Sequence, residues 1–273
     1  MTVSDRDADR VLKTRHRAMW ASGDYPSVHT EVIHELGPRL VQAAKVSRGD
    51  RVLDVAAGSG NVAIPAALTG ADVIASDLAP ELFDTGRALA AEAGAELRWE
   101  EGDAEHLPYG DADFDSVLSC VGVMFAPHHR EAADELVRVC RPGGTIGLIA
   151  WTPEGFIGRL FATMKPYAPP PPAGASPPPL WGDEAHVRDL LGDRVTDLVA
   201  RRHQLRVDRF GSGEEFRDFF RARYGPTISV YKQVSADPER TAALDRDLVA
   251  LADSALAAGV MEWEYLLVTA VRS

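Results

Sequence analysis

Short apolar runs alternate with longer amphipathic stretches through the first half of the chain. Five of these runs predict strands, and the stretches between them, with apolar residues three and four positions apart, predict helices. The strands are expected at 51–55, 72–77, 96–100, 114–120 and 144–151. Because strands that alternate with helices form a parallel sheet covered on both faces, this pattern predicts an α/β fold.

The flanking segments have a different pattern. Residues 1–47 are expected to form an N-terminal helical cap, and residues 48–273 the main domain. Two late strands are expected at 201–208 and 262–271, with a helical insertion at about 211–259 between them. Overall, we predict a doubly wound, Rossmann-like, mostly parallel sheet of seven strands, with the last strand antiparallel and a helical cap.

Residues 166–179 contain eight of the 18 prolines in the chain. Proline has no backbone N–H and clashes with the preceding helical turn, so this segment is expected to be neither a helix nor a central strand. Two roles are open. The segment could be a passive extended spacer, or it could be a semi-rigid flap beside a functional site, since long loops in compact domains are often functional.

Composition and charge exclude several kinds of function. Apolar residues make up 45% of the 273 residues and charged residues 26%, as in ordinary globular proteins. The formal net charge of -12 argues against proteins that bind phosphate backbones or membrane surfaces through Lys and Arg. No apolar stretch is long enough to predict a membrane span, and the charged N-terminus does not resemble a signal peptide. Cys120 and Cys140 are expected to be buried free thiols, which favours a cytoplasmic protein. From the charge and the lack of a membrane span, we expect no nucleic-acid or membrane partner.

The turn after the first strand is the most informative segment. Asp54 lies near the end of that strand and is followed by Ala56, Gly58 and Gly60 before the next helix. Glycine allows unusual backbone angles and a close approach of a ligand, and the helix N-terminus offers unpaired N–H groups. The segment that starts at Gly58 also fits the dinucleotide fingerprint G-x-G-x-x-G/A, so the turn alone leaves a nicotinamide cofactor open.

Acidic residues lie near the ends of the first three strands. Asp77, 19 residues after Gly58, is placed to accept hydrogen bonds from ribose hydroxyls. Asp103 is placed to accept one from an adenine amine, with the backbone N–H of Ala104 beside it. Asp54 suits the positive end of a ligand better than a pyrophosphate. The three carboxylates favour a cationic adenosine ligand such as S-adenosylmethionine, although each could instead cap a turn or a helix.

With these motifs in order, the sequence resembles the class I S-adenosylmethionine-dependent methyltransferases. The closest likeness is to the small-molecule branch that includes the quinone-biosynthesis C-methyltransferases, and it covers roughly residues 45–151. The first motif of the family is met by Asp54, Gly58 and Gly60, with Ala56 in place of its first glycine. Leu-Val-Arg-Val-Cys-Arg-Pro-Gly-Gly before the fifth strand also follows the pattern of the family.

The resemblance and the position of the strand ends together imply the site residues. The residues expected to bind the cofactor are Asp54, Ala56, Gly58, Gly60, Asp77, Leu78, Asp103, Ala104, Cys120 and Tyr25. The residues expected to line the substrate pocket are Trp20, Met124, Phe125, Trp151 and Tyr224. For the pocket residues, packing in the core is an equally open alternative.

His128 and His129 follow the fourth strand and are candidate general bases, because histidine titrates near neutral pH. The alternative is a surface or capping role, and a base is needed only if the nucleophile must lose a proton. Two adjacent histidines cannot easily point at one ion, so no metal is expected.

The sequence therefore predicts methyl transfer from S-adenosylmethionine to a small, hydrophobic or aromatic metabolite, by a monomer or a homodimer. In the family that it resembles, Asn-Pro-Pro-Tyr or Asp-Pro-Pro-Tyr after the fourth strand marks methylation of planar amino groups in nucleic acid and protein. This chain has Ser-Cys-Val-Gly at 119–122 instead. Two alternatives remain: a nicotinamide-dependent oxidoreductase, and a non-catalytic binding protein that retains the methyltransferase fold.

Overall fold

The computed structural model describes residues 3–172 and 174–273, so Met1 and Thr2 of the predicted cap and Ala173 of the proline-rich segment lie outside it. Seven strands form one sheet in the order β3-β2-β1-β4-β5-β7-β6. The strands are β1 (Arg51–Val55), β2 (Asp72–Asp77), β3 (Arg98–Glu101), β4 (Phe114–Cys120), β5 (Cys140–Trp151), β6 (Val195–Val207) and β7 (Met261–Arg272).

The directions of the strands confirm the predicted fold. Leu53 in β1 lies opposite Ile74 of β2 and Val117 of β4, and both pairings are parallel. Among the strands of the described residues, β7 alone runs in the opposite direction, so its pairings with β5 and β6 are antiparallel. The chain order reverses between β1 and β4, and in such sheets ligands bind outside the carboxyl ends of the strands at this point.

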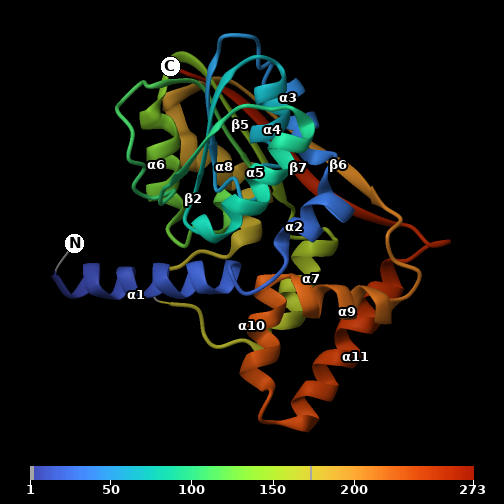
Figure 1. The fold of residues 1–273 in the computed structure, drawn as a ribbon. Helices are drawn as coiled ribbons and strands as arrows, with labels where there is room; N and C mark the ends of the chain where they lie inside the picture. Colours follow the sequence, from blue (N-terminus) through green and yellow to red (C-terminus); the bar gives the residue numbers. More distant parts are fainter. Residues whose placement is uncertain (1–2, 173) are drawn as a thin grey trace.

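Helices cover both faces of the sheet (Figure 1). In one layer, α3 (Leu36–Ala43) contacts α4 (Ala63–Leu68), which contacts α5 (Phe83–Ala93). In the other layer, α6 (His129–Val139) contacts α8 (Glu184–Leu191). Because α3 lies against β4 and β5, it belongs to one of the layers that cover the sheet.

A helical unit extends beyond one end of the sheet (Figure 1). Its helices are α7 (Phe156–Met164), α9 (Gly213–Arg223), α10 (Gly225–Val234) and α11 (Pro238–Ala255). Three of these helices, α9, α10 and α11, lie within residues 211–259, and α7 contacts α11. Two further helices, α1 (Val3–Trp20) and α2 (Tyr25–Val28), precede α3, and α1 contacts α10.

Short turns connect these elements. One is a π-helical turn, η1 (His29–Ile33), and the others are 3-10 turns: η2 (Pro80–Leu82), η3 (Val123–Phe125), η4 (Lys165–Tyr167), η5 (Pro178–Gly182) and η6 (Gly192–Arg194). The described part of the proline-rich segment lies between η4 and η5 and is attached to the body of the protein, because the Ser176 N–H donates a hydrogen bond to the Pro127 carbonyl at 2.9 Å.

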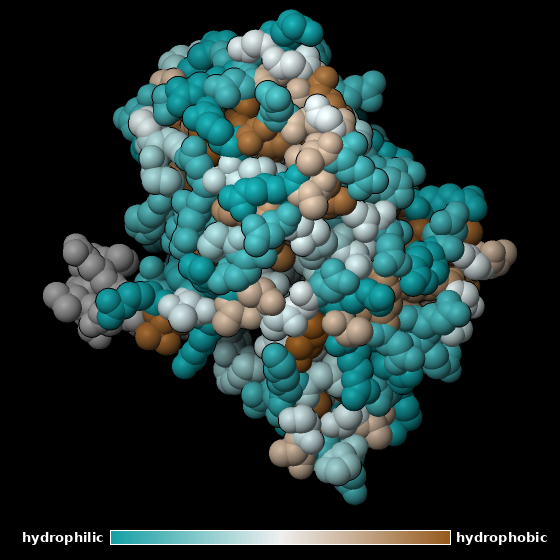
Figure 2. Space-filling view, viewed as in Figure 1, coloured by the Kyte–Doolittle hydropathy of each residue, from teal (hydrophilic) through white to brown (hydrophobic). Residues whose placement is uncertain are grey.

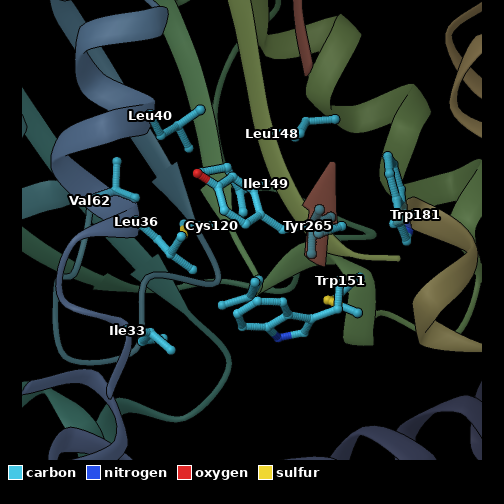
Figure 3. Packing of buried hydrophobic residues seen from close by; sticks show 14 of the residues in the cluster. Ile33, Leu36, Leu40, Val62, Cys120, Leu148, Ile149, Trp151, Trp181 and Tyr265 are labelled. Carbon is cyan, nitrogen blue, oxygen red and sulfur yellow. The ribbon is translucent and has the colours of Figure 1, made fainter. Parts of the chain in front are cut away.

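The core lies between the sheet and its helices. Figure 3 shows Cys120 beside Leu36 and Ile149, from α3 and β5. Cys120 and Cys140 are both free and buried, as predicted, and burial raises the pKa of each thiol. Where β7 meets the helical unit, the ring of Phe156 stacks on Trp263 with centroids 5.3 Å apart. This aromatic packing joins the helical unit to the sheet.

The surface in view is mainly hydrophilic, with scattered apolar residues (Figure 2). In residues 3–172 and 174–273, no helix is both long enough and apolar enough to cross a membrane.

Candidate active site

A cavity of about 670 Å³, counting the space that opens to solvent, lies at the carboxyl ends of β1 to β4. Each of these strands contributes the residues that directly follow it, and α1 and α2 contribute the rest of the wall. The lining residues are Lys13, His16, Trp20, Tyr25, Ala56, Gly58, Asp77, Leu78, Leu82, Gly102, Asp103, Ala104, Val121, Gly122, Val123, Phe125, Ala126 and Pro127. We call it the first cavity.

The turn after β1 has three residues in the left-handed region of backbone space. The φ angles are +57° at Ala56, +56° at Gly58 and +91° at Gly60. Ala56 and Gly58 line the first cavity, but Gly60 does not. A Cβ on residue 60 would lie 2.8 Å from the ring of Trp99, so this glycine allows the turn to approach β3 closely.

Asp77 holds this turn in place and faces the first cavity. Its carboxylate accepts hydrogen bonds from the backbone N–H groups of Gly58 and Ala79, both at 2.8 Å. Burial raises the pKa of Asp77, and the two hydrogen bonds oppose that rise. A carboxylate can accept about four hydrogen bonds, so two backbone donors leave capacity for hydroxyl groups of a ligand.

Three of the predicted cofactor residues do not line the first cavity. Asp54 is 1% exposed and accepts a hydrogen bond from the Ala63 N–H at 2.9 Å, which caps the start of α4. Burial raises the pKa of Asp54. Gly60 and Cys120 are also outside the lining. The structure thus shows the capping role of Asp54 and does not place its carboxylate at the cavity wall.

Sequence reasoning missed Lys13, which lies on α1 and is 8% exposed. Its Nζ lies 2.8 Å from Asp103 Oδ1 and 2.5 Å from Glu105 Oε2. Glu105 also accepts hydrogen bonds from the backbone N–H of His128 at 2.7 Å and pairs with its Nδ1 at 2.9 Å. This ionic network attaches α1 to the residues that follow β3 and β4. The sequence offered no signal for Lys13, because it stands among many other charged residues.

His16, one turn of α1 beyond Lys13, also lines the first cavity and was not predicted. Burial lowers the pKa of its imidazole, and the nearby Lys13 ammonium lowers it further, against the opposing charges of Glu105, Asp103 and Asp9. His16 is therefore expected to be neutral near pH 7.

Neither of the two predicted catalytic histidines lines the first cavity. His129 is 2% exposed, its Nδ1 lies 3.0 Å from His186 Nε2, and burial and His186 lower its pKa to about 4. His128 pairs with Glu105. Burial lowers the pKa of the His128 imidazole, but the hydrogen bond to Glu105 and the nearby carboxylates outweigh this effect, so the pKa of His128 is raised overall. Their positions support structural roles, and we do not carry the general-base assignment further.

Asp9, Glu105 and His128 bring three possible metal-ligand atoms within 4.8 Å of one another. However, the Lys13 ammonium already lies 2.5 Å from Glu105 Oε2. A cation bound there would meet this positive charge at close range, so the cluster is explained as an ionic network.

A second and much smaller cavity adjoins the first and shares Tyr25, Val121 and Phe125 with it. Its lining is formed by Tyr25, Val28, Ile33, Val121, Phe125, Trp151, Ile157, Phe220, Tyr224 and Trp263. Of the predicted pocket residues, Trp20 and Phe125 line the first cavity. Phe125, Trp151 and Tyr224 line the second, whereas the fully buried Met124 lines neither.

Val121 stands where the two cavities meet and has a φ of +47°. This angle is a genuine outlier for a β-branched residue, and strain of this kind persists only where the surroundings enforce it. The Val121 N–H donates to the Ile149 carbonyl at 2.7 Å, which fixes the turn after β4. Backbone outliers of this kind cluster at functional sites.

Trp20 connects the elements around both cavities. Its ring lies edge-on to Tyr25, Phe125 and Tyr224, with centroid separations of 5.6, 4.7 and 6.0 Å. The N-terminal segment, the turn after β4 and the start of α10 therefore meet at a single indole ring.

Comparisons with known proteins agree with this geometry. Residues 52–144 match a family described as "Methyltransferase domain". An uncharacterized protein of Mycobacterium tuberculosis is 55% identical over 262 residues, 96% of each chain. A demethylmenaquinone methyltransferase of Deinococcus radiodurans is 36% identical over 115 residues, which are 41% of this chain and 48% of that protein. Among solved structures, phosphoethanolamine N-methyltransferase 2 of Haemonchus contortus, in complex with phosphomonomethylethanolamine and S-adenosylhomocysteine, has a TM-score of 0.52 and 15% identity, over 87% of this chain and 52% of that one.

The fold, the strand-end motifs and these relatives define a methyltransferase of the Rossmann-like type. The chain belongs to the class I S-adenosylmethionine-dependent methyltransferases. Within that family, it is similar over nearly its full length to the uncharacterized mycobacterial protein and over less than half of it to the demethylmenaquinone enzyme.

Proposed function

We propose that this protein transfers the methyl group of S-adenosylmethionine to a small molecule with a hydrophobic or aromatic body. The observation that carries the proposal is the pair of joined cavities. The first is lined by the strand-end motifs, and the second is lined by apolar and aromatic side chains. Membership of the family supports the reaction, and the complex of the Haemonchus enzyme with S-adenosylhomocysteine supports the cofactor.

The residues of the first cavity fit this cofactor. Asp77 has acceptor capacity left for ribose hydroxyls, and Asp103 and the Ala104 N–H are available to an adenine ring. At Gly58 the wall is open: an added Cβ would meet only the ring of Tyr25, at 3.4 Å, so a ligand can approach the backbone there.

The protein would contribute positioning and shielding. When bound, S-adenosylmethionine supplies an activated methyl group. Tyr25, Val121 and Phe125 line both cavities, so the reacting atoms are expected beside them. Holding two reactants in line removes much of the entropic cost of the reaction. Among the described residues, no Asp, Glu, His or Lys lines the second cavity, so we assign no protein base to the acceptor.

The nicotinamide alternative depended on the glycine turn and Asp77, and the methyltransferase family accounts for both. Calorimetry with S-adenosylhomocysteine, NAD⁺ and NADP⁺ tests the choice. We expect binding of S-adenosylhomocysteine alone, and binding of a nicotinamide cofactor alone would refute the proposal.

A second assay addresses the non-catalytic alternative. The protein is incubated with S-adenosylmethionine that carries an isotope-labelled methyl group and with an organic-solvent extract of cells. We expect a labelled, extractable product by mass spectrometry. Tight binding of the cofactor with no labelled product from any extract would favour a binding protein instead.

A further inference from the structure

We propose that the second cavity is the acceptor subsite for an uncharged, flat molecule that carries an oxygen able to accept hydrogen bonds. This inference rests on the proposed function, because it takes the methyl group to lie where the two cavities meet. It narrows the substrate class in three ways: by charge, by shape, and by the need for an oxygen.

The wall of the second cavity carries no formal charge. Within the part of the chain that the structure describes, its lining contains no Asp, Glu, Lys, Arg or His. A charged molecule that entered it would lose its hydration without gaining a counter-charge, which is costly. The side chains of this lining that can ionise are the phenols of Tyr25 and Tyr224. Burial raises the pKa of both phenols, so they stay neutral near pH 7.

Aromatic rings form much of the wall and favour a flat ligand. Trp263 lies edge-on to Trp151 and to Phe220, with centroid separations of 5.9 Å in both cases. Phe220 in turn lies 5.2 Å from Tyr224. A planar apolar body can pack against such rings through offset or edge-on contacts, which add to the gain from burying its surface.

Three polar groups of the same wall lack partners. Trp263 is 1% exposed, and its indole Nε1 has no hydrogen-bond partner among the described residues. The hydroxyls of Tyr25 and Tyr224 make no hydrogen bond to any residue that the structure describes. By contrast, the Tyr167 and Tyr231 hydroxyls bind Asp247 and Asp245 at 2.5 and 2.6 Å.

An unpaired buried donor is costly, so the Trp263 indole N–H needs an explanation. Six other described residues also carry a buried polar atom without a partner, but none of them lines either cavity: Asp9, Asn61, Ser76, Tyr109, His129 and Trp181. In the second cavity, one ligand could satisfy the free donors. A carbonyl, phenol or enol oxygen on a flat ring system has the required acceptor, and two or three such contacts are enough to fix its orientation.

Aromatic walls can also hold quaternary ammonium ions through cation–π contacts. The absence of a carboxylate from the described lining makes an uncharged ligand the better fit here, because cations also need a counter-charge once they are buried. The experiment below therefore includes a cationic probe.

The test uses the full chain saturated with S-adenosylhomocysteine and measures the binding of four naphthalene probes by calorimetry. The probes are 1-naphthol, unsubstituted naphthalene, the 1-naphthoate anion and the 1-naphthylmethylammonium cation. We expect 1-naphthol to bind best, and naphthalene to bind about threefold to tenfold more weakly, the range for one hydrogen bond. Either ion binding as tightly as 1-naphthol, or equal binding of naphthol and naphthalene, would overturn the proposal.

Two variants locate the binding. Tyr224→Phe removes one hydroxyl and should weaken 1-naphthol about threefold to tenfold while leaving naphthalene unchanged. Its matched control is Tyr231→Phe, in the same helical unit but outside both cavities, which should leave naphthol binding unchanged. Val28→Trp fills the second cavity and should abolish binding of naphthol.

Binding of S-adenosylhomocysteine to each variant separates the two proposals. Intact binding of S-adenosylhomocysteine without any naphthol binding to the natural chain overturns this inference alone. Loss of S-adenosylhomocysteine binding by the natural chain would overturn the proposed function instead. If Val28→Trp does not fold, Tyr224→Phe still decides, because it removes only one oxygen.

Discussion

The two joined cavities are built in different ways. The first is formed mainly by turns at the ends of four consecutive parallel strands, from Ala56 to Pro127, together with α1 and α2. The second is formed by side chains from Tyr25 to Trp263, which come together only when the helical unit closes against the sheet. Backbone turns leave a signature of glycines and carboxylates at fixed spacing, whereas an apolar wall has the composition of any core. In the function that we propose, the difference separates the cofactor side from the side that selects the acceptor.

The largest expected effect tests the first cavity. Asp77→Ala removes the acceptor for the Gly58 and Ala79 N–H groups and, in the complex that we propose, for the ribose hydroxyls. Hydrogen bonds to a charged group contribute about 1.5–3 kcal/mol each, so we expect S-adenosylhomocysteine to bind at least about 100-fold more weakly by calorimetry.

The control for this variant is Asp84→Ala, on the exposed side of α5, where the side chain is 96% exposed. It should leave the affinity unchanged. An Asp77→Ala protein that binds S-adenosylhomocysteine normally would remove Asp77 from the cofactor site and weaken the distinction between the two cavities.

A smaller effect concerns how α1 is held over the first cavity. Lys13→Met leaves the Glu105 side chain, 1% exposed, without its ammonium partner. Removing one partner of a buried ion pair is strongly destabilising. Because 10% of the Lys13 side chain is exposed and His128 still pairs with Glu105, we expect a loss near the lower end of the usual range, about 3 kcal/mol in the free energy of unfolding. Urea denaturation measures this loss.

The double variant Lys13→Met/Glu105→Gln should regain most of the lost stability, because the unpaired charge is gone. Lys232→Met, at an exposed position of α10, is the matched control and should change the stability by less than about 0.5 kcal/mol. If Lys13→Met behaved like this control, α1 would not depend on the ionic network.

The third prediction asks whether His129 is structural or a base. The folded protein lowers its pKa from 6.5 to about 4, so the neutral form is favoured and the associated stability is present above pH 6.5. That stability is lost as the pH falls towards 4, by roughly 2 kcal/mol between pH 7 and pH 5. His129→Leu should therefore lose less stability on acidification than the natural chain does.

The measurement is urea denaturation of both proteins at pH 7 and pH 5, with the exposed His106→Gln as the control. An identical loss of stability in the natural chain and in His129→Leu would contradict the structural role. A pH-dependent methyl-transfer rate that disappears in His129→Leu at unchanged stability would restore the base assignment.

The smallest effect is expected at Ala56. Its left-handed backbone costs about 1–2 kcal/mol for a residue other than glycine, but glycine also gains entropy in the unfolded chain, by roughly 0.5–1 kcal/mol. Ala56→Gly should therefore change the free energy of unfolding by no more than about 1 kcal/mol in either direction. A loss above about 2 kcal/mol would show that the Ala56 methyl group has a packing role at the cavity wall.

Much of the fold and of the first cavity could be predicted because both depend on local patterns. The alternation of strands and helices predicts the parallel sheet, and its carboxyl ends bring Gly58, Asp77 and Asp103 to one edge. The same reasoning could not separate a residue at the wall from one just behind it. Asp54 caps α4, and Gly60 allows the approach to Trp99, so both stand in the motif without lining the cavity.

The rest depended on contacts between distant segments. Lys13 acquires its role from Asp103, 90 residues away, and nothing near Lys13 in the sequence indicates that pairing. The adjacent histidines suggested a base, but His129 turns towards His186, 57 residues away. The strand predicted at 201–208 extends back to Val195 in the structure. The register of β6 shifts between Thr196 and Val199, where Asp197 has a φ of +50°, and this irregularity interrupts the alternating pattern that predicts a strand.

A crystal structure of the protein with S-adenosylhomocysteine and 1-naphthol bound tests the central claim most directly. We predict that the ribose hydroxyls bind Asp77 and that the sulfur lies beside Tyr25, Val121 and Phe125, with the naphthol ring in the second cavity. A sulfur atom that points away from these three residues, or a naphthol bound outside the second cavity, would contradict the account.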